Sequence, residues 1–165
     1  MGGVLRGVAV VAAVLVFASP AWARHEDDAS PQLSFSWPVA GTITRGFGYD
    51  GDEWHPGIDI GTLSSLDVHA AAGGTVEAVG YATGFEGYGN IVLVDVGSGF
   101  ETLYGHLSSV GVSVGDVVVV GQMLGLAGCT GYCTGTHLHF ELRLHGVAMD
   151  PALLMPATIP GPEGG

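Results

Sequence analysis

The chain has 165 residues, with 16 acidic side chains against 4 basic ones and a formal net charge of −12. Such an acidic chain repels nucleic-acid phosphates and anionic lipid surfaces, so we exclude a nucleic-acid-binding function and expect no nucleic-acid partner. The length fits one domain with a proper hydrophobic core, and we expect a monomer.

The first 23 residues have the pattern of a secretory signal peptide. Arg6 is the only charged residue among them, an apolar run covers residues 7–17, and Ala-Trp-Ala ends at Ala23 as a small-x-small cleavage site. The alternative is an uncleaved anchor, but the run is shorter than the about 20 apolar residues that span a membrane. We therefore expect a secreted, extracytoplasmic protein with no stable membrane anchor after cleavage.

Composition divides the chain into four segments. We expect the signal peptide at residues 1–23, a flexible polar leader at 24–37, a folded domain at 38–155 and a flexible Pro/Gly tail at 156–165.

Short apolar runs separated by glycine predict an all-β domain. We expect a turn-rich loop at 48–53 and one helical turn at 150–155, which has proline at its first helical position. The expected strands are 42–47, 75–79, 91–96, 100–107, 117–126 and 137–144. Their regular spacing predicts an antiparallel two-sheet sandwich or open barrel with Gly-rich loops.

One stretch, from His137 to Leu144, carries an unusual set of polar groups. Polar and apolar residues alternate along it, which is the pattern of a strand whose successive side chains point to opposite faces. One face therefore carries His137, His139, Glu141 and Arg143. Such a cluster is expensive to build for packing alone, so we interpret it as half of a metal site.

The other half is expected from two earlier motifs. His55 and Asp59 form His-x-x-x-Asp, where Pro-Gly argues against a helix and favours His55 in a turn and Asp59 in a short strand. His106 lies in Tyr-Gly-His-Leu, near a strand end. A catalytic zinc takes three protein ligands and keeps a fourth position for water. Four histidines and one aspartate leave two imidazoles for proton transfer and for charge on a developing oxyanion.

The three motifs, ending in Gly-Thr-His-Leu-His-Phe-Glu, together resemble the lysostaphin-type or LytM-like zinc metallopeptidases of family M23, over residues 38–154. The resemblance implies that His55, Asp59 and His139 hold Zn²⁺, and that His106 and His137 are catalytic. It also implies a secreted zinc endopeptidase that hydrolyses peptide bonds in the stems or cross-bridges of bacterial peptidoglycan. The alternative is a catalytically silent domain that binds cell wall or activates another hydrolase.

Further residues near these motifs have simpler roles. We expect Glu141 further along its strand, with Arg143 as its counter-charge; the alternative is that Glu141 orients a ligand imidazole by accepting its second N–H. The resemblance suggests Tyr49 as a residue that steadies a transition state. Cys129 and Cys133 flank three residues, and export favours a disulfide between them over a metal site. Such a bridge would stiffen the approach to His137.

Overall fold

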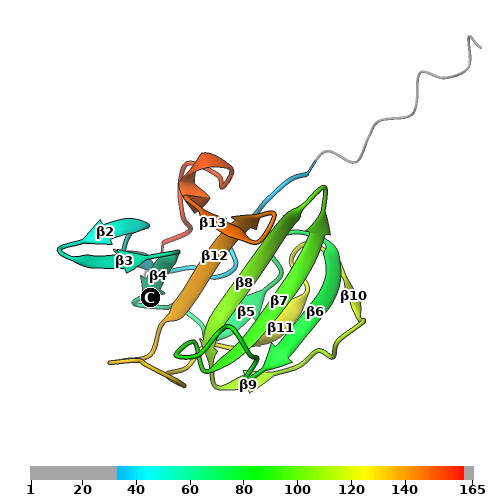
Figure 1. Cartoon of the computed structure of the whole chain (residues 1–165), viewed down its shortest axis with the longest axis horizontal. Helices are drawn as coiled ribbons and strands as arrows, with labels where there is room; N and C mark the ends of the chain where they lie inside the picture. Colours follow the sequence, from blue (N-terminus) through cyan, green and yellow to red (C-terminus); the bar gives the residue numbers. More distant parts are fainter. Residues whose placement is uncertain (1–32, 162–165) are drawn as a thin grey trace, which may run out of the picture. The chain divides into compact units, whose positions relative to one another are not determined.

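The computed structural model describes residues 33–161, and these form a nearly all-β domain (Figure 1). The expected signal peptide, the leader up to residue 32 and residues 162–165 of the tail lie outside the described residues. No helix within residues 33–161 is long and apolar enough to cross a membrane. In chain order the strands are β1 (Thr42–Arg45), β2 (Gly48–Asp50), β3 (Glu53–His55), β4 (Ile58–Gly61), β5 (Asp67–His69), β6 (Gly74–Gly80), β7 (Asn90–Gly97), β8 (Phe100–Leu107), β9 (Ser109–Val110), β10 (Val117–Val118), β11 (Met123–Leu126), β12 (Leu138–Leu144) and β13 (Val147–Met149).

The largest sheet is antiparallel and has eight strands, in the order β1-β4-β12-β8-β7-β6-β10 with β13 also paired to β12. A three-stranded sheet has the order β5-β11-β9, and β2 and β3 form a separate hairpin. The large sheet ends at β1 and β10 without closing on itself, so the architecture is an open sandwich and not a barrel.

The core lies between the large sheet and the three-stranded sheet. Val92, Tyr104 and Phe140 of the large sheet join Val68 of β5 and Leu124 of β11 in one buried cluster. Full burial of one such aliphatic or aromatic side chain contributes about 1.5–3 kcal/mol to folding. The alternation predicted for β12 is confirmed, since Leu138 and Phe140 pack in this core cluster while His139 between them lines the groove on the other face.

The opposite face of the large sheet carries the polar groups. There, Leu103 of β8 lies beside Glu141 of β12, and Gly105 lies beside His139. A smaller apolar cluster on this face is covered by the connection between β6 and β7, through Phe85 and Tyr88. The polar face of β12 is therefore walled by residues 81–89.

Most predicted strands correspond to observed ones, with two errors. The loop expected at 48–53 contains the β2–β3 hairpin, and His55 ends β3 instead of lying in a turn. The strand expected at 117–126 is two strands, because a turn at Gly121 (φ +78°) separates β10 in one sheet from β11 in the other. The expected helical turn is present as a 3₁₀ helix at Pro151–Leu153, and the Asp150 side chain accepts a hydrogen bond from Ala152 N at 2.9 Å.

Strand β8 contains one extra residue relative to β7. Between two successive paired positions, β7 advances two residues, from Asn90 to Val92. Over the same span β8 runs three residues, from Leu107 to Tyr104. This β-bulge includes His106, whose φ of +60° lies in the left-handed region that a side chain disfavours. Tyr104 and Leu107 consequently both point into the core, and His106 is turned to the opposite face.

The positive φ of His106 predicts a specific ranking of substitutions at this position. His106→Gly should unfold with a free energy about 1 kcal/mol higher than His106→Ala, because glycine adopts the left-handed region without a Cβ penalty. Urea unfolding of the two variants measures the difference. If alanine proves as stable as glycine there, the bulge does not hold the strained backbone described above.

Candidate metal centre and active site

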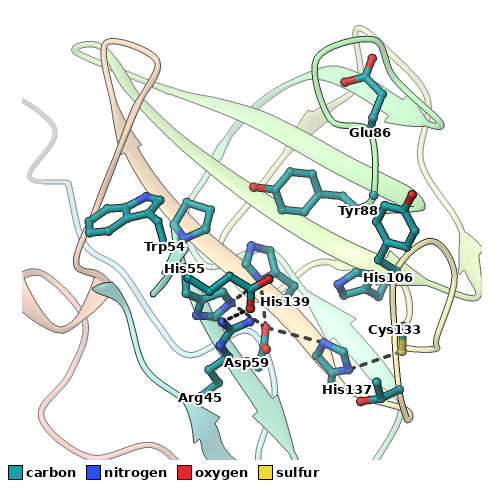
Figure 2. Close-up of a pocket in the computed structure, with 15 residues that line it drawn as sticks. Arg45, Trp54, His55, Asp59, Glu86, Tyr88, His106, Cys133, His137 and His139 are labelled. Atoms are coloured by element: carbon teal, nitrogen blue, oxygen red, sulfur yellow. Dashed lines mark hydrogen bonds and ion pairs between the residues drawn. The ribbon is translucent and has the colours of Figure 1, made fainter. Parts of the chain in front are cut away.

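Three side chains of the polar face converge on one point. His55 Nε2 lies 3.2 Å from Asp59 Oδ1 and 3.1 Å from His139 Nδ1, and that Nδ1 lies 2.8 Å from the same Asp59 oxygen (Figure 2). The residues come from the end of β3, from β4 and from β12. The strand register places Asp59 directly beside His139, so two of the three donors are fixed by sheet pairing.

This triangle matches the ligand spacing of a zinc site. A tetrahedral zinc with bonds of about 2.0–2.1 Å keeps its ligand atoms about 3.3 Å apart, and two imidazoles with one carboxylate are a common catalytic set. All three donor atoms fall within a span that a single metal ion can bridge. The residues present therefore fit a zinc ion.

Without a metal, the same triangle binds a proton. Burial opposes ionisation of Asp59, but hydrogen bonds from His139 and His55 hold the pKa of its carboxyl well below the usual value. Burial likewise disfavours a charged His139, yet hydrogen bonds to Asp59 and Glu141 raise the pKa of its imidazole. A cation that binds here takes the place of that proton, so binding is expected to release it.

A backbone carbonyl orients His55. Its Nδ1 lies 2.7 Å from Gly46 O, and because a carbonyl only accepts, that nitrogen carries the proton. In the neutral ring the lone pair is then on Nε2, the atom that faces Asp59 and would bind a metal. The position of the Gly46 carbonyl, just before β2, therefore determines that Nε2 is the ligand atom of His55.

His139 is oriented by a side chain. Its Nε2 lies 3.1 Å from Glu141 Oε1, while Nδ1 faces the other two donors. Of the two interpretations of Glu141, the geometry matches the one in which it accepts the second N–H of this imidazole. Arg143 Nη1 donates to Glu141 Oε2 at 2.5 Å, as expected for its counter-charge.

Two further imidazoles lie at the edge of the triangle. His106 and His137 have ring centroids 4.7 Å apart, and His137 Nε2 is 3.6 Å from Asp59 Oδ1. His106 Nδ1 donates to Thr130 O at 2.7 Å, and His137 Nδ1 donates to Gly135 O at 2.7 Å. Burial lowers the pKa of His106, which favours a neutral ring with a free Nε2. In the neutral form of each ring, the carbonyl contact places the proton on Nδ1 and the lone pair on Nε2.

All five residues line one open groove of about 720 Å³. One wall is formed by Arg45 and Trp54, with Arg45 paired to Glu53 at 2.9 Å. The other wall is formed by Tyr88 and Tyr132. The groove is open to solvent and contains both acidic and basic side chains, so its shape suits an extended polar chain.

Cys129 and Cys133 are joined by a disulfide, as the sequence suggested. The loop that they close reaches both outer histidines: Thr130 O accepts from His106, and Cys133 Sγ lies 3.6 Å from His137 Nδ1. Tyr132 N also donates to Gly87 O at 2.7 Å, which ties the loop to the groove wall. The loop therefore supports one side of the site.

Two residues differ from the sequence interpretation. Tyr49 is 77% exposed, packs edge-on against Trp54 at 5.1 Å and is not among the groove-lining residues of the described chain. Tyr88 was not singled out from the sequence, although its hydroxyl donates to Glu141 Oε1 at 2.6 Å. No local pattern marks it, because it lies in an irregular connection far in sequence from β12.

Comparison with known sequences adds an independent line of evidence. The model of peptidase family M23 matches residues 53–151. The "DD-carboxypeptidase/endopeptidase Mpg" of Neisseria meningitidis serogroup B is 38% identical over 109 residues, which are 66% of this chain and 24% of that protein. The "Murein hydrolase activator EnvC" of Escherichia coli is 35% identical over 124 residues, or 74% of this chain and 29% of that protein. The chain thus spans about a quarter of the length of these curated relatives.

Solved structures share the fold. The catalytic domain of lysostaphin from Staphylococcus simulans has a TM-score of 0.62 and 31% identity, covering 68% of this chain and 90% of that domain. A zinc-containing peptidase from Vibrio cholerae has a TM-score of 0.64 and 31% identity, covering 77% of this chain and 41% of that one. The predicted fold class, an antiparallel LytM-like β core, is therefore confirmed.

The disulfide loop can be tested without any assay of activity. Unreduced, denatured protein should contain no titratable thiol, and two reactive thiols would rule the bridge out. In Cys129→Ser/Cys133→Ser, the amides of Tyr132 and His137 should exchange about tenfold faster, because their hydrogen bonds belong to the loosened segment. Amides of β7, in the core, serve as the control and should keep their rates. Unchanged exchange at Tyr132 and His137 would show that the bridge does not support the site.

Proposed function

The chain belongs to peptidase family M23, and we propose that it is a zinc-dependent endopeptidase that hydrolyses peptide bonds in bacterial peptidoglycan. We assign His55, Asp59 and His139 as zinc ligands, and His106 and His137 as catalytic residues. The observation that carries the proposal is the triangle of three donor atoms with two oriented imidazoles in the same groove.

Zinc bound to this triangle would polarise a scissile carbonyl and make an attacking water more acidic. The protein's own part is to fix the three donors in advance: β4–β12 pairing places Asp59 and His139, and Gly46 O orients His55. Because these contacts exist in the protein alone, little reorganisation is needed when the ion and substrate bind.

His106 and His137 provide two sites for a proton. Each ring donates through Nδ1 to a backbone carbonyl, so each Nε2 is free to accept a proton. In the proposed reaction one Nε2 takes the proton of the attacking water and later returns it to the leaving amine. The other ring would act in its imidazolium form, with a second proton taken from solvent on Nε2, and would donate that N–H to the carbonyl oxygen as negative charge develops there.

The substrate proposal depends on the groove and the relatives. The groove of about 720 Å³ is open to solvent and not an enclosed cavity, so an extended peptide chain can lie in it and continue beyond it. The Neisseria relative is named for cleavage by carboxypeptidase and endopeptidase activity. Peptide stems or cross-bridges of peptidoglycan are therefore the substrate class that we propose for this chain.

The second candidate is an activator of another hydrolase, which is what the name of the Escherichia coli relative describes. A silent domain has no need to keep three converging ligands and two oriented imidazoles. This chain keeps all five in one groove, which supports the enzyme over the activator.

We also propose that the protein acts outside the cytoplasm. The basis is the sequence pattern of residues 1–23 and the location of peptidoglycan itself. N-terminal sequencing of exported protein should begin at or near Arg24, whereas an intact Met1 in the membrane fraction would favour an anchor.

The ligand assignment predicts the metal content of variants. The parent protein should bind about one zinc ion per chain, and His139→Ala should lose most of it, because two remaining donors do not complete the site. Elemental analysis after dialysis measures the ratio. His145→Ala, in the turn between β12 and β13, is the matched control and should retain zinc. Full zinc occupancy in His139→Ala would mean that the ligand assignment is wrong.

The catalytic assignment predicts variants that keep zinc but lose turnover. His106→Ala and His137→Ala should each lower the rate by about 10²–10⁴-fold, the usual contribution of general acid–base catalysis. Mass analysis of fragments released from purified peptidoglycan measures the rate and identifies the broken bond. A near-normal rate would remove that histidine from the mechanism, and a zinc-loaded parent that releases no fragments would favour the activator.

A further inference from the structure

Glu141 is a buried charge with an unusual setting. Within residues 33–161 it is the only carboxylate among the buried residues, with 0% of its surface exposed. Its two oxygens accept hydrogen bonds from His139, Tyr88 and Arg143. A buried carboxylate is costly to a fold unless its partners are complete, so the position is built around those donors.

The three donors divide between the two carboxylate oxygens. Oε2 takes Arg143 Nη1 at 2.5 Å, while Oε1 is shared by Tyr88 Oη at 2.6 Å and His139 Nε2 at 3.1 Å. The carboxylate of Glu141, paired with Arg143, only accepts hydrogen bonds, so His139 Nε2 carries a proton. When the proton shared by His139 Nδ1 and Asp59 is lost, the lone pair of the ring is therefore on Nδ1. Rotating the ring by half a turn about Cβ–Cγ would put Cε1 in the place of Nε2 and Cδ2 in the place of Nδ1, so this hydrogen bond and the contact with Asp59 would both be lost.

Tyr88, a residue of the groove wall, contacts both Glu141 and the His139 ring. Its ring centroid lies 5.0 Å from that of His139, and its carbonyl accepts from His106 N at 2.7 Å. Gly105 leaves room for the contact, because a Cβ there would lie 3.3 Å from His139 Cβ and 3.5 Å from Tyr88 Cδ1. Its hydroxyl donates to Glu141 Oε1, because a carboxylate oxygen only accepts.

We propose that Tyr88 and Glu141 are positioning residues, which hold the His139 ring with Nδ1 turned toward Asp59 and so set the affinity of the site for zinc. The inference rests on the proposed function, because it assumes that this triangle binds zinc. It adds that a residue of the groove wall, outside the ligand motifs, acts on the metal through the pair Tyr88–Glu141. Contacts of this kind to a ligand histidine typically change metal affinity by about 10–100-fold.

The test uses two conservative variants of the full chain. Tyr88→Phe removes one hydroxyl, and Glu141→Gln leaves a single acceptor oxygen where three donors converge. Zinc affinity is measured by competition with a chromogenic chelator, and should fall about tenfold or more in each variant. The double variant should bind no more weakly than Glu141→Gln, because Tyr88 acts only through Glu141. Tyr81→Phe, an exposed tyrosine of the same connection, is the matched control and should bind as the parent does.

A second measurement separates positioning from general destabilisation. ¹⁵N NMR of the imidazoles reports which nitrogen of His139 carries the proton. In metal-free protein, at a pH high enough for His139 to be neutral, the parent should show its remaining proton on Nε2, and the variants should show a mixture of the two tautomers. A variant that was merely less stable would keep the parent tautomer in its folded form. If Glu141→Gln does not fold, Tyr88→Phe decides the question, since it preserves the ring and its packing.

The outcomes separate this inference from the function on which it depends. A parent that binds zinc, with variants that match its affinity and tautomer, overturns the positioning role and leaves the zinc assignment intact. A parent that binds no zinc overturns both. Weaker zinc binding together with a mixed His139 tautomer supports the inference, and a loss of affinity equal to that in Tyr81→Phe contradicts it.

Discussion

Each of the four groove histidines has one ring nitrogen occupied by a fixed acceptor, and the arrangement of the site depends on this constraint. Three of the acceptors are backbone carbonyls, those of Gly46, Thr130 and Gly135, and the fourth is the carboxylate of Glu141. An imidazole held in this way has a defined tautomer and a defined direction for its remaining lone pair. The groove therefore presents four oriented nitrogen atoms before any ion or substrate arrives.

Regular sheet geometry supplies only part of that arrangement. Pairing of β4 with β12 sets Asp59 beside His139, and the outward faces of both strands bring them to one side of the sheet. The remaining pieces come from irregular backbone: a bulge at His106, the hairpin β2–β3 that ends at His55, and the disulfide loop before β12. The site therefore combines two donors that regular strand pairing fixes with three histidines that irregular backbone segments place.

The sequence predicted the all-β class and the faces of β12, because alternation is a local signal. The histidines and the aspartate that meet in the groove were expected from their motifs together with the resemblance to the M23 peptidases, on which the choice of His106 depended. It did not predict the bulge in β8, whose extra residue shows only when two strands are paired. Tyr88 was missed because its partner Glu141 is 53 residues away in the chain. The hairpin was read as a loop because three-residue strands are too short to show a period. Contacts made across the fold were thus the part that local patterns could not supply.

The extra residue in β8 makes the length of this strand matter as much as its composition. Its side chains can be exchanged while the backbone keeps its path, since the bulge is a property of how many residues lie between Tyr104 and Leu107. Losing one residue there would restore strict alternation and shift His106 or its replacement out of the groove. Natural variation in this mostly buried strand is thus expected to exchange side chains of similar size, while insertions and deletions collect in the turns on either side.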